Sequence, residues 1–135
     1  MMIQEHASRS FAWKASSFRS SAEDSLQLTD SDRKELVDLV RSLPAGTRVE
    51  DCTRDQLALP GLAARLDEAS HQVRAGRGFV VLRGLPTDEI SVDEYVAAVW
   101  AVGQYFGDPL SQNTDGELIG HVIDATAEDP TPRMY

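Results

Sequence analysis

Residues 78–86 constrain the fold of this chain more than any other stretch of its sequence. Four apolar residues, 79–82, follow one another without interruption, and Gly84 and Pro86 come directly after them. A short unbroken apolar run predicts a strand buried on both faces, because a strand with one wet face alternates apolar and polar residues. Pro86 cannot donate a hydrogen bond to a sheet, so the strand is expected to end before it. Such a strand needs neighbours on both sides, and we expect the chain to supply only some of them.

The composition narrows the classes of function. The 135 residues fit one domain of ordinary size, and 13 basic against 22 acidic residues give a net charge of −9. Phosphate backbones and anionic lipid repel such a chain, so we expect no nucleic-acid and no membrane partner. Neither a membrane-spanning run nor the apolar core of a secretory signal is present in the sequence. The single cysteine, Cys52, fits a reducing compartment, and we expect a cytoplasmic protein whose oligomeric state is open.

Start and stop signals predict two helices before the apolar strand. The first begins at residues 29–32, whose side chains offer N-cap oxygens and early negative charge, and it ends at Pro44. The second has Pro60 in its first turn and ends near Gly76. His71 lies within this second helix, where we expect an exposed side chain rather than a metal ligand.

The third helix has the clearest start in the sequence. Ser91 and Glu94 match the capping box, in which each side chain accepts a hydrogen bond from the other residue's backbone N–H. Gly107 is expected to cap the end of this helix, and Pro109 prevents its continuation. Its buried side is predicted to include Val96, Val99, Trp100 and Val102.

The two ends of the chain have a different character. Residues 1–27 are predicted to be an extended N-terminal arm, and residues 28–135 are predicted to form the domain. Trp13 and Phe18 are costly to leave in water, so we expect them to dock on the body of the protein. Residues 118–124 read as a second strand, followed by a loop.

The residues themselves do not form a recognisable catalytic motif. Iron sites on strands use His-x-Asp, because residues two apart point to the same face, and none of the three histidines is followed by such a carboxylate. His121 and Asp124 are three apart and would point to opposite faces of a strand. Phosphate-binding glycine loops and nucleophile elbows are also missing from the sequence. We therefore assign no catalytic and no metal-binding residue.

Several stretches together resemble the N-terminal part of one enzyme family, the TauD/TfdA-like (clavaminate synthase-like) iron(II)- and 2-oxoglutarate-dependent dioxygenases. The resemblance runs from about Leu28 onward and rests on Leu59-Pro60, on residues 76–86, on residues 102–109, on Ser111 to Asn113 with the Gly116 turn, on residues 118–124 and on residues 133–135. It implies an α+β fold: N-terminal helices and the first strands of a double-stranded β-helix, or jelly roll, with an incomplete core.

The resemblance also implies a chemistry that this sequence does not complete. In the family, a His-x-Asp and a distant His hold iron, 2-oxoglutarate binds the iron beside an anchoring Arg, and a small organic substrate is oxidised. The sequence ends before the position of the His-x-Asp, and none of its arginines, Arg65, Arg74, Arg83 and Arg133 among them, matches the anchor. We therefore expect no cofactor to bind this chain alone. By resemblance, Gln112 and Asn113 are candidate substrate-binding residues, although Asn and Gly favour turns in any case.

Three hypotheses remain open from the sequence. The first is an N-terminal oxygenase fragment that is inactive alone. The second is a non-catalytic binding domain that docks a partner through the apolar strand face, since exposed apolar area of that size marks an interface. The third is a protein whose missing half is supplied by a separate chain.

Overall fold

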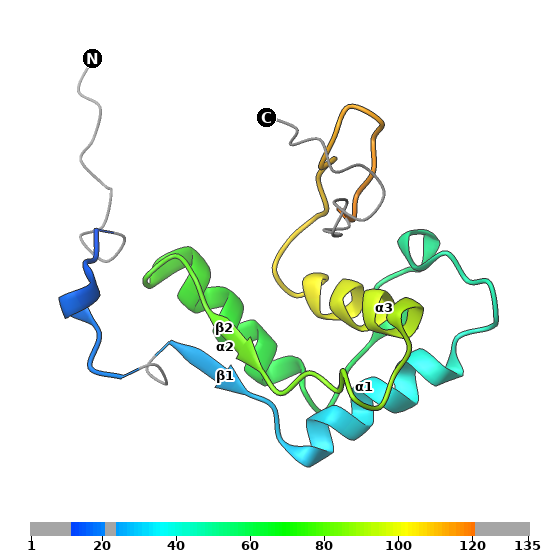
Figure 1. Cartoon of the computed structure of the whole chain (residues 1–135), viewed down its shortest axis with the longest axis horizontal. Helices are drawn as coiled ribbons and strands as arrows, with labels where there is room; N and C mark the ends of the chain where they lie inside the picture. The colour runs from blue at the N-terminus through cyan, green and yellow to red at the C-terminus, as the bar shows by residue number, and fades with distance from the viewer. Residues whose placement is uncertain (1–11, 21–23, 121–135) are drawn as a thin grey trace, which may run out of the picture.

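A computed structural model describes residues 12–20 and 24–120, which form three α-helices and a small parallel sheet (Figure 1). The helices are α1 (Asp30–Ser42), α2 (Ala63–Ala75) and α3 (Val92–Gly103), and the strands are β1 (Ser25–Gln27) and β2 (Val81–Arg83). Short 3-10 helices cover Ala15–Ser17 (η2), Val49–Asp51 (η3) and Asp55–Leu57 (η4). The described part of the chain is therefore an α+β protein, in agreement with the predicted class at this coarse level.

The first helix begins and ends where the sequence predicts. The Thr29 hydroxyl accepts a hydrogen bond from the backbone N–H of Asp32 (3.2 Å), and the Asp32 carboxylate accepts one from the Thr29 backbone N–H (2.7 Å). Helix α1 ends at Ser42, two residues before Pro44. This is expected, because a proline disfavours the helical conformation at the residue before it, here Leu43. Leu36, Val37 and Val40 are buried on one face of this helix.

The second helix begins later than predicted. Pro60 lies in a turn before α2, not in its first helical turn, because the N–H groups of Leu62 and Ala63 both bond to the carbonyl of Leu59 and make a tight turn first. Leu66 and Ala69, which lie three residues apart and so share one side of the helix, are buried. The helix ends at Ala75, with Gly76 as its C-cap, and His71 is exposed as expected.

The capping box of the third helix is confirmed. The Glu94 carboxylate accepts from the Ser91 backbone N–H at 2.8 Å, and the Ser91 hydroxyl accepts from the Glu94 backbone N–H at 3.3 Å. The predicted end is wrong, because α3 stops at Gly103 rather than at Gly107. Beyond Gly103 the chain tightens into turns, in which Tyr105 N–H bonds to the carbonyl of Val102.

One residue of the predicted buried face of α3 is exposed. Trp100 is buried at 8% exposure, as predicted, but Val99 is 43% exposed. Helix α3 packs on α1, and its buried residues include the small Ala97, Ala98 and Ala101, so the covered side of the helix leaves Val99 outside.

The prediction of a strand buried on both faces is wrong. Strand β2 covers three residues only, Val81 is 40% exposed, and Leu82 is half-buried. Within the described residues its paired neighbour is β1 alone, and α2 lies behind the sheet in the view of Figure 1. The strand therefore has one covered face, and on its other face Val81 is largely in solvent.

The sheet joins two distant segments in parallel. Ser25, Leu26 and Gln27 of β1 stand opposite Val81, Leu82 and Arg83 of β2. Helices α1 and α2 form the crossover that a parallel pair requires. Strand β1 thus places the last residues of the predicted arm in the sheet. The turn after β2 is fixed to α1, since Arg33 donates to the carbonyl of Gly84 (3.1 Å) and pairs with Asp88 and Glu89 (2.7 Å each).

The hydrophobic core lies between α1, α3 and the connector of residues 49–62. Its central side chains are buried almost completely: Leu36, Leu57, Leu59, Leu62 and Leu66. Tyr105 closes one side, because its hydroxyl accepts a hydrogen bond from the Leu59 backbone N–H at 3.0 Å. Residues 118–120, the described part of the second predicted strand, are not a strand, and residues 121–124 lie outside the described residues.

Candidate functional site

The turn that carries the two predicted substrate-binding residues is well defined. The Asn113 side-chain carbonyl accepts hydrogen bonds from the backbone N–H groups of Asp115 and Glu117, both at 3.1 Å. This is the side-chain arrangement that holds Asx-type turns together, and Gly116 follows with a φ of 80°, a conformation that glycine adopts without strain. The Asn113 side chain is therefore engaged in its own turn.

The surroundings of Gln112 differ from those of Asn113. Its side-chain amide donates to the carbonyl of Leu110 (2.8 Å), and its backbone N–H donates to the carbonyl of Glu117 (2.6 Å). These bonds place Gln112 in the wall of a groove at the C-terminal end of α3. A contact of either residue with a substrate stays a prediction, but Gln112 is the one that lines a cavity.

The groove has a volume of about 730 Å³ and is lined mainly by apolar side chains. Helix α3 contributes Val99 and Trp100, the segment after it contributes Phe106, and residues 118–120 fold back to close the far side. Gln104, Asp108 and Gln112 add polar groups. Apolar walls with a few polar groups and a volume of this size are typical of small-molecule sites. The sequence did not indicate Gln104 as a site residue, because the helix was predicted to continue past it to Gly107. Asp108 follows the helix in both cases, and no motif marked it.

Trp100 brings a further polar group to this region. Its indole Nε1 is fully buried and has no hydrogen-bond acceptor among the described residues. A buried donor without a partner costs about 1–3 kcal/mol, so it is a place where an added acceptor stabilises the protein. Because Trp100 lines the groove, the sequence-based view of this residue as core alone is incomplete.

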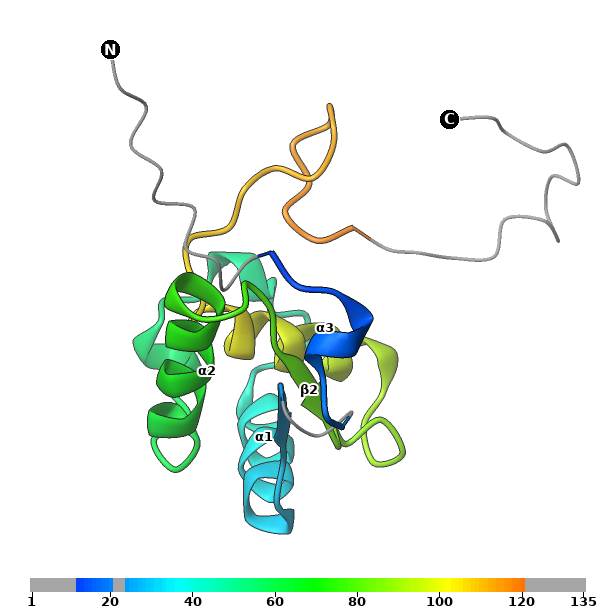
Figure 2. The same cartoon turned by 90° about the vertical axis from the view of Figure 1, so that its left-hand side faces the viewer.

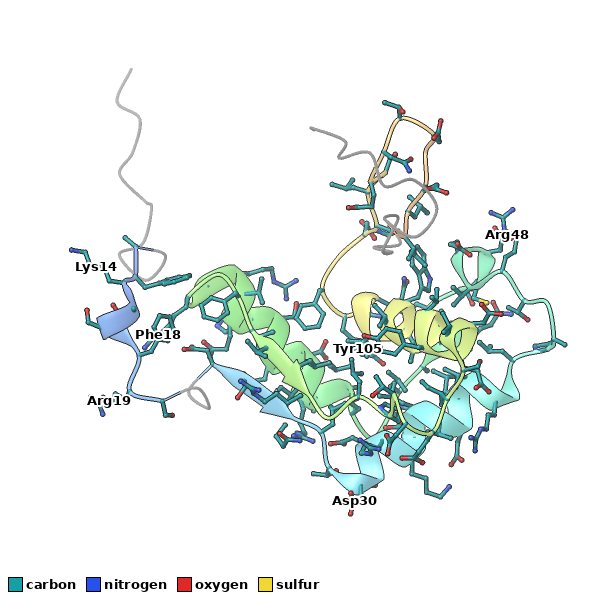
Figure 3. All side chains as sticks on the ribbon, viewed as in Figure 1. Lys14, Phe18, Arg19, Asp30, Arg48 and Tyr105 are labelled. Atoms are coloured by element: carbon teal, nitrogen blue, oxygen red, sulfur yellow. The ribbon has the colours of Figure 1, made fainter. Side chains whose placement is uncertain are left out.

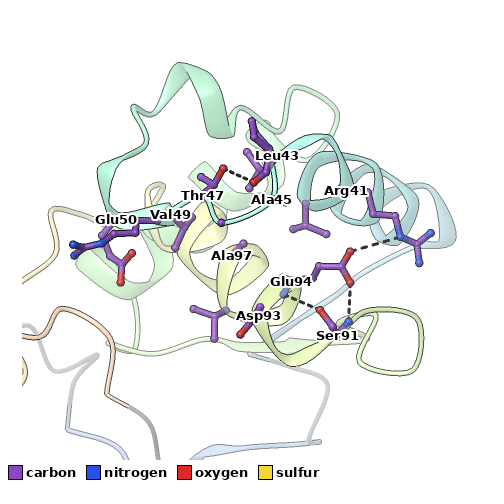
Figure 4. Close-up of a pocket in the computed structure, with 15 residues that line it drawn as sticks. Arg41, Leu43, Ala45, Thr47, Val49, Glu50, Ser91, Asp93, Glu94 and Ala97 are labelled. Carbon is purple, nitrogen blue, oxygen red and sulfur yellow. Dashed lines mark hydrogen bonds and ion pairs between the residues drawn. The ribbon is translucent and has the colours of Figure 1, made fainter.

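A second cavity, of about 670 Å³, lies between the end of α1, the loop of residues 43–50 and the first turn of α3 (Figure 4). Figure 4 shows Arg41, Glu94 and Ser91 joined in a row, with the Arg41 guanidinium 3.9 Å from the Glu94 carboxylate. The hydrogen bond from the Ser91 backbone lowers the pKa of Glu94 below its ordinary value, and the Arg41 charge adds to this shift. The Arg41–Glu94 ion pair links the end of α1 to the first turn of α3, and the Ser91–Glu94 hydrogen bonds cap α3.

The described residues do not fit an iron centre. His71 is exposed on α2, and His6 and His121 lie outside the described residues. Across residues 12–20 and 24–120, no three His, Cys, Asp or Glu side chains converge as a metal requires. Arg65 is also engaged, because its guanidinium pairs with Asp32 and donates to the carbonyl of Gln27.

Comparisons with known proteins add no family to this description: no protein-family model matches the chain, and no curated protein matches it. None of the helices in the described part of the chain has the length and apolar character needed to cross a bilayer. The fold and the groove therefore define a small α+β protein with a half-open parallel sheet and an apolar groove beside α3.

Proposed function

We propose that this chain is the N-terminal part of an iron(II)- and 2-oxoglutarate-dependent dioxygenase of the TauD/TfdA-like class, acting on a small organic substrate in the cytoplasm. In this proposal its helices and two strands flank a double-stranded β-helix. The chain supplies scaffold and substrate-side contacts, and the iron ligands, the 2-oxoglutarate anchor and hence the activity require residues beyond these 135.

The observation that supports the substrate-side role is the position of Gln112. The resemblance selects this residue as a substrate contact, and in the structure it lines an apolar groove together with Trp100 and Ile119. A polar group set in an apolar wall orients a small ligand by one directed hydrogen bond, while the wall supplies the contact area.

The state of the sheet supports the architectural part of the proposal. Parallel sheets are normally covered on both faces, and two strands alone are marginal in water. Here β2 pairs with β1 only, within the described residues, and Val81 is 40% exposed. Further strands of a larger fold would cover this surface.

The coding sequence beyond Tyr135 provides the decisive test. We expect an in-frame continuation that contains a His-x-Asp or His-x-Glu, a distant His and an Arg. A genomic read of the same locus without such a continuation, in frame or in an adjacent reading frame, overturns the proposal.

A titration of the purified 135-residue chain tests the expected inactivity. Anaerobic addition of Fe(II) and 2-oxoglutarate is expected to give no metal-to-ligand charge-transfer absorption. A clear charge-transfer band followed by succinate formation in air contradicts this, because these residues would then hold iron themselves.

A second candidate function is a non-catalytic binding domain. The exposed Val81 and the half-buried Phe79, two residues apart, place apolar surface on the outer face of the sheet, where a protein partner can pack. A monodisperse chain that melts cooperatively by itself favours this candidate over the oxygenase fragment.

A further inference from the structure

Three aromatic side chains join the N-terminal segment to the start of β2. The Trp13 ring lies edge-on to the Phe18 ring, with centroids 5.1 Å apart, and the Phe79 centroid is 5.2 Å from Trp13 and 5.8 Å from Phe18. Phe79 is two residues before β2, and Figure 3 shows Phe18 between the N-terminal ribbon and this part of the chain. The sequence-based expectation that Trp13 and Phe18 dock on the body is confirmed.

Arg77 is the second anchor of this contact. Its guanidinium carbon lies 4.6 Å from the Phe18 ring centroid, and its NH1 donates to the carbonyl of Ser17 at 3.2 Å. Its backbone carbonyl accepts a hydrogen bond from the Trp13 indole at 3.1 Å, and its Nε lies 3.5 Å from the Asp24 carboxylate. Arg77 thus contacts the N-terminal segment on both sides of η2, and it is also tied to the residue preceding β1.

Side chains, rather than backbone pairing, hold the N-terminal segment against the start of β2. Within the described part of the chain, the backbone–backbone hydrogen bonds of residues 13–18 are local, from Ser17 to Lys14 and from Phe18 to Ala15. Trp13 remains 46% exposed, whereas the core leucines are at most a few per cent exposed. Segments with few buried contacts open at a lower free energy than the core.

We infer that residues 13–18 form a strap that opens and closes over the start of β2 while the core stays folded. In the closed state the strap covers Phe79 through Trp13 and Phe18. Opening removes the Phe18 side of a hollow of about 400 Å³ that Phe79, Val81 and Asp24 also line. The strap therefore sets how often the apolar start of β2 meets solvent, and this inference does not depend on the proposed enzyme family.

The two tryptophans of the chain allow a direct test in the full 135-residue protein. Their indole N–H signals are followed by NMR during hydrogen exchange in native buffer and at low denaturant concentrations. The Trp13 indole is expected to exchange through local opening, at a rate that low denaturant hardly changes. The buried Trp100 indole is expected to exchange only through global unfolding, with a steep denaturant dependence.

Substitutions in the strap separate its opening from unfolding of the core. Phe18→Ala removes an aromatic contact and is expected to speed Trp13 exchange by about tenfold, with Trp100 exchange unchanged. Arg77→Gln is expected to act in the same direction. Lys14→Ala, a change of an exposed strap residue, is the matched control and should leave both rates unchanged.

Two results overturn the inference. If both indoles exchange at one rate and respond equally to denaturant and to Phe18→Ala, the strap is part of the cooperative core. If the Trp13 indole exchanges as fast as a free indole, the strap is not closed in solution.

Discussion

Asp32 connects three parts of the molecule through one carboxylate. Its side chain is 9% exposed, caps α1 by accepting from the Thr29 backbone, and pairs with Arg65 of α2. Arg65 in turn donates to the Gln27 carbonyl at the end of β1. A buried carboxylate is tolerated only when it is hydrogen-bonded and paired, so this group fixes how α1, α2 and the sheet meet.

Replacement of Arg65 tests this connection. Arg65→Gln is expected to lower the free energy of unfolding by about 1–2 kcal/mol, because Asp32 loses its charge partner while Arg65 itself is partly exposed. The denaturation midpoint measured by circular dichroism reports the change. Arg74→Gln, on the exposed side of the same helix, is the control and should stay within about 0.5 kcal/mol. Equal effects of the two variants contradict the role of the Asp32–Arg65 pair.

The same carboxylate predicts a dependence of stability on pH. Burial by itself raises the pKa of Asp32, but hydrogen bonds with Thr29 and Arg65 outweigh it and bring the pKa below its ordinary value of 3.8. A carboxyl group with a lowered folded-state pKa stabilises the fold above its unfolded-state pKa, and this contribution is lost as the pH falls through the folded-state pKa.

We therefore expect Asp32→Asn to have a lower free energy of unfolding than the unchanged protein at pH 6. The difference should shrink as the pH falls below about 4, because the unfolded chain takes up the proton first and folded Asp32 takes it up only at a lower pH. Urea denaturation from pH 3 to pH 6 measures it. A difference that stays constant over this range shows that Asp32 keeps an ordinary pKa.

At the scale of elements, the helices carry strong local signals and the strands carry weak ones. The cap of α3 joins Ser91 and Glu94 within four residues of sequence, so its hydrogen bonds need no residue from elsewhere in the chain. Strand β2 instead takes its environment from β1, which lies more than fifty residues earlier in the chain.

Removal of the α3 cap tests the local signal. Ser91→Ala is expected to destabilise the protein by about 1 kcal/mol, because the Glu94 backbone N–H loses its acceptor. Thermal melting followed by circular dichroism measures the loss. Ser91→Thr keeps the hydroxyl and should restore most of the stability, and a destabilisation by Thr as large as that by Ala argues against the cap.

Substitutions in β2 test which face of the strand is covered. Val81→Thr is expected to change the free energy of unfolding by less than about 0.5 kcal/mol, since this side chain is largely in solvent. Leu82→Ala is expected to cost about 1–2 kcal/mol, because Leu82 packs against the core cluster. Comparable losses in both variants would instead indicate a strand that is covered on both faces in solution.

At the scale of the whole molecule, the sheet is the part where we expect association with other chains. A short parallel pair with an apolar outer face offers unpaired edge groups to other chains. The net charge of −9 opposes association, but this repulsion is screened at physiological salt. We expect poor solubility of the isolated chain at high concentration.

Light scattering over a concentration series tests the source of this association. Val81→Lys places a charge on the open strand and is expected to shift association to higher concentration. Leu110→Lys makes the same change of charge at a residue that is 75% exposed and outside the sheet, so it controls for net charge. An equal effect of both variants, or a monodisperse unchanged protein with a sharp thermal transition, contradicts the role of the sheet.

The sequence by itself determined the parts of this protein that depend on neighbouring residues. The caps at Thr29 and Ser91 and the stop before Pro44 follow from signals that act within one helical turn. The turn at Asn113 was also predictable, because its side chain bonds to backbone groups two and four residues away. Hydrogen bonds and steric limits between residues close in sequence depend only on that short stretch of sequence.

Only the tertiary structure decided burial, pairing and the surroundings of the candidate site. An apolar run such as residues 79–82 states which residues prefer to be covered, but not how many neighbours arrive to cover them. The pairing of Ser25 with Val81 joins segments whose approach depends on the packing of α1 and α2 between them. The exposure of Val99 likewise depends on which side of α3 the rest of the fold covers. The hydrophobic effect is non-directional and specifies no particular partner. Which apolar side chains are buried therefore depends on the packing of the whole fold.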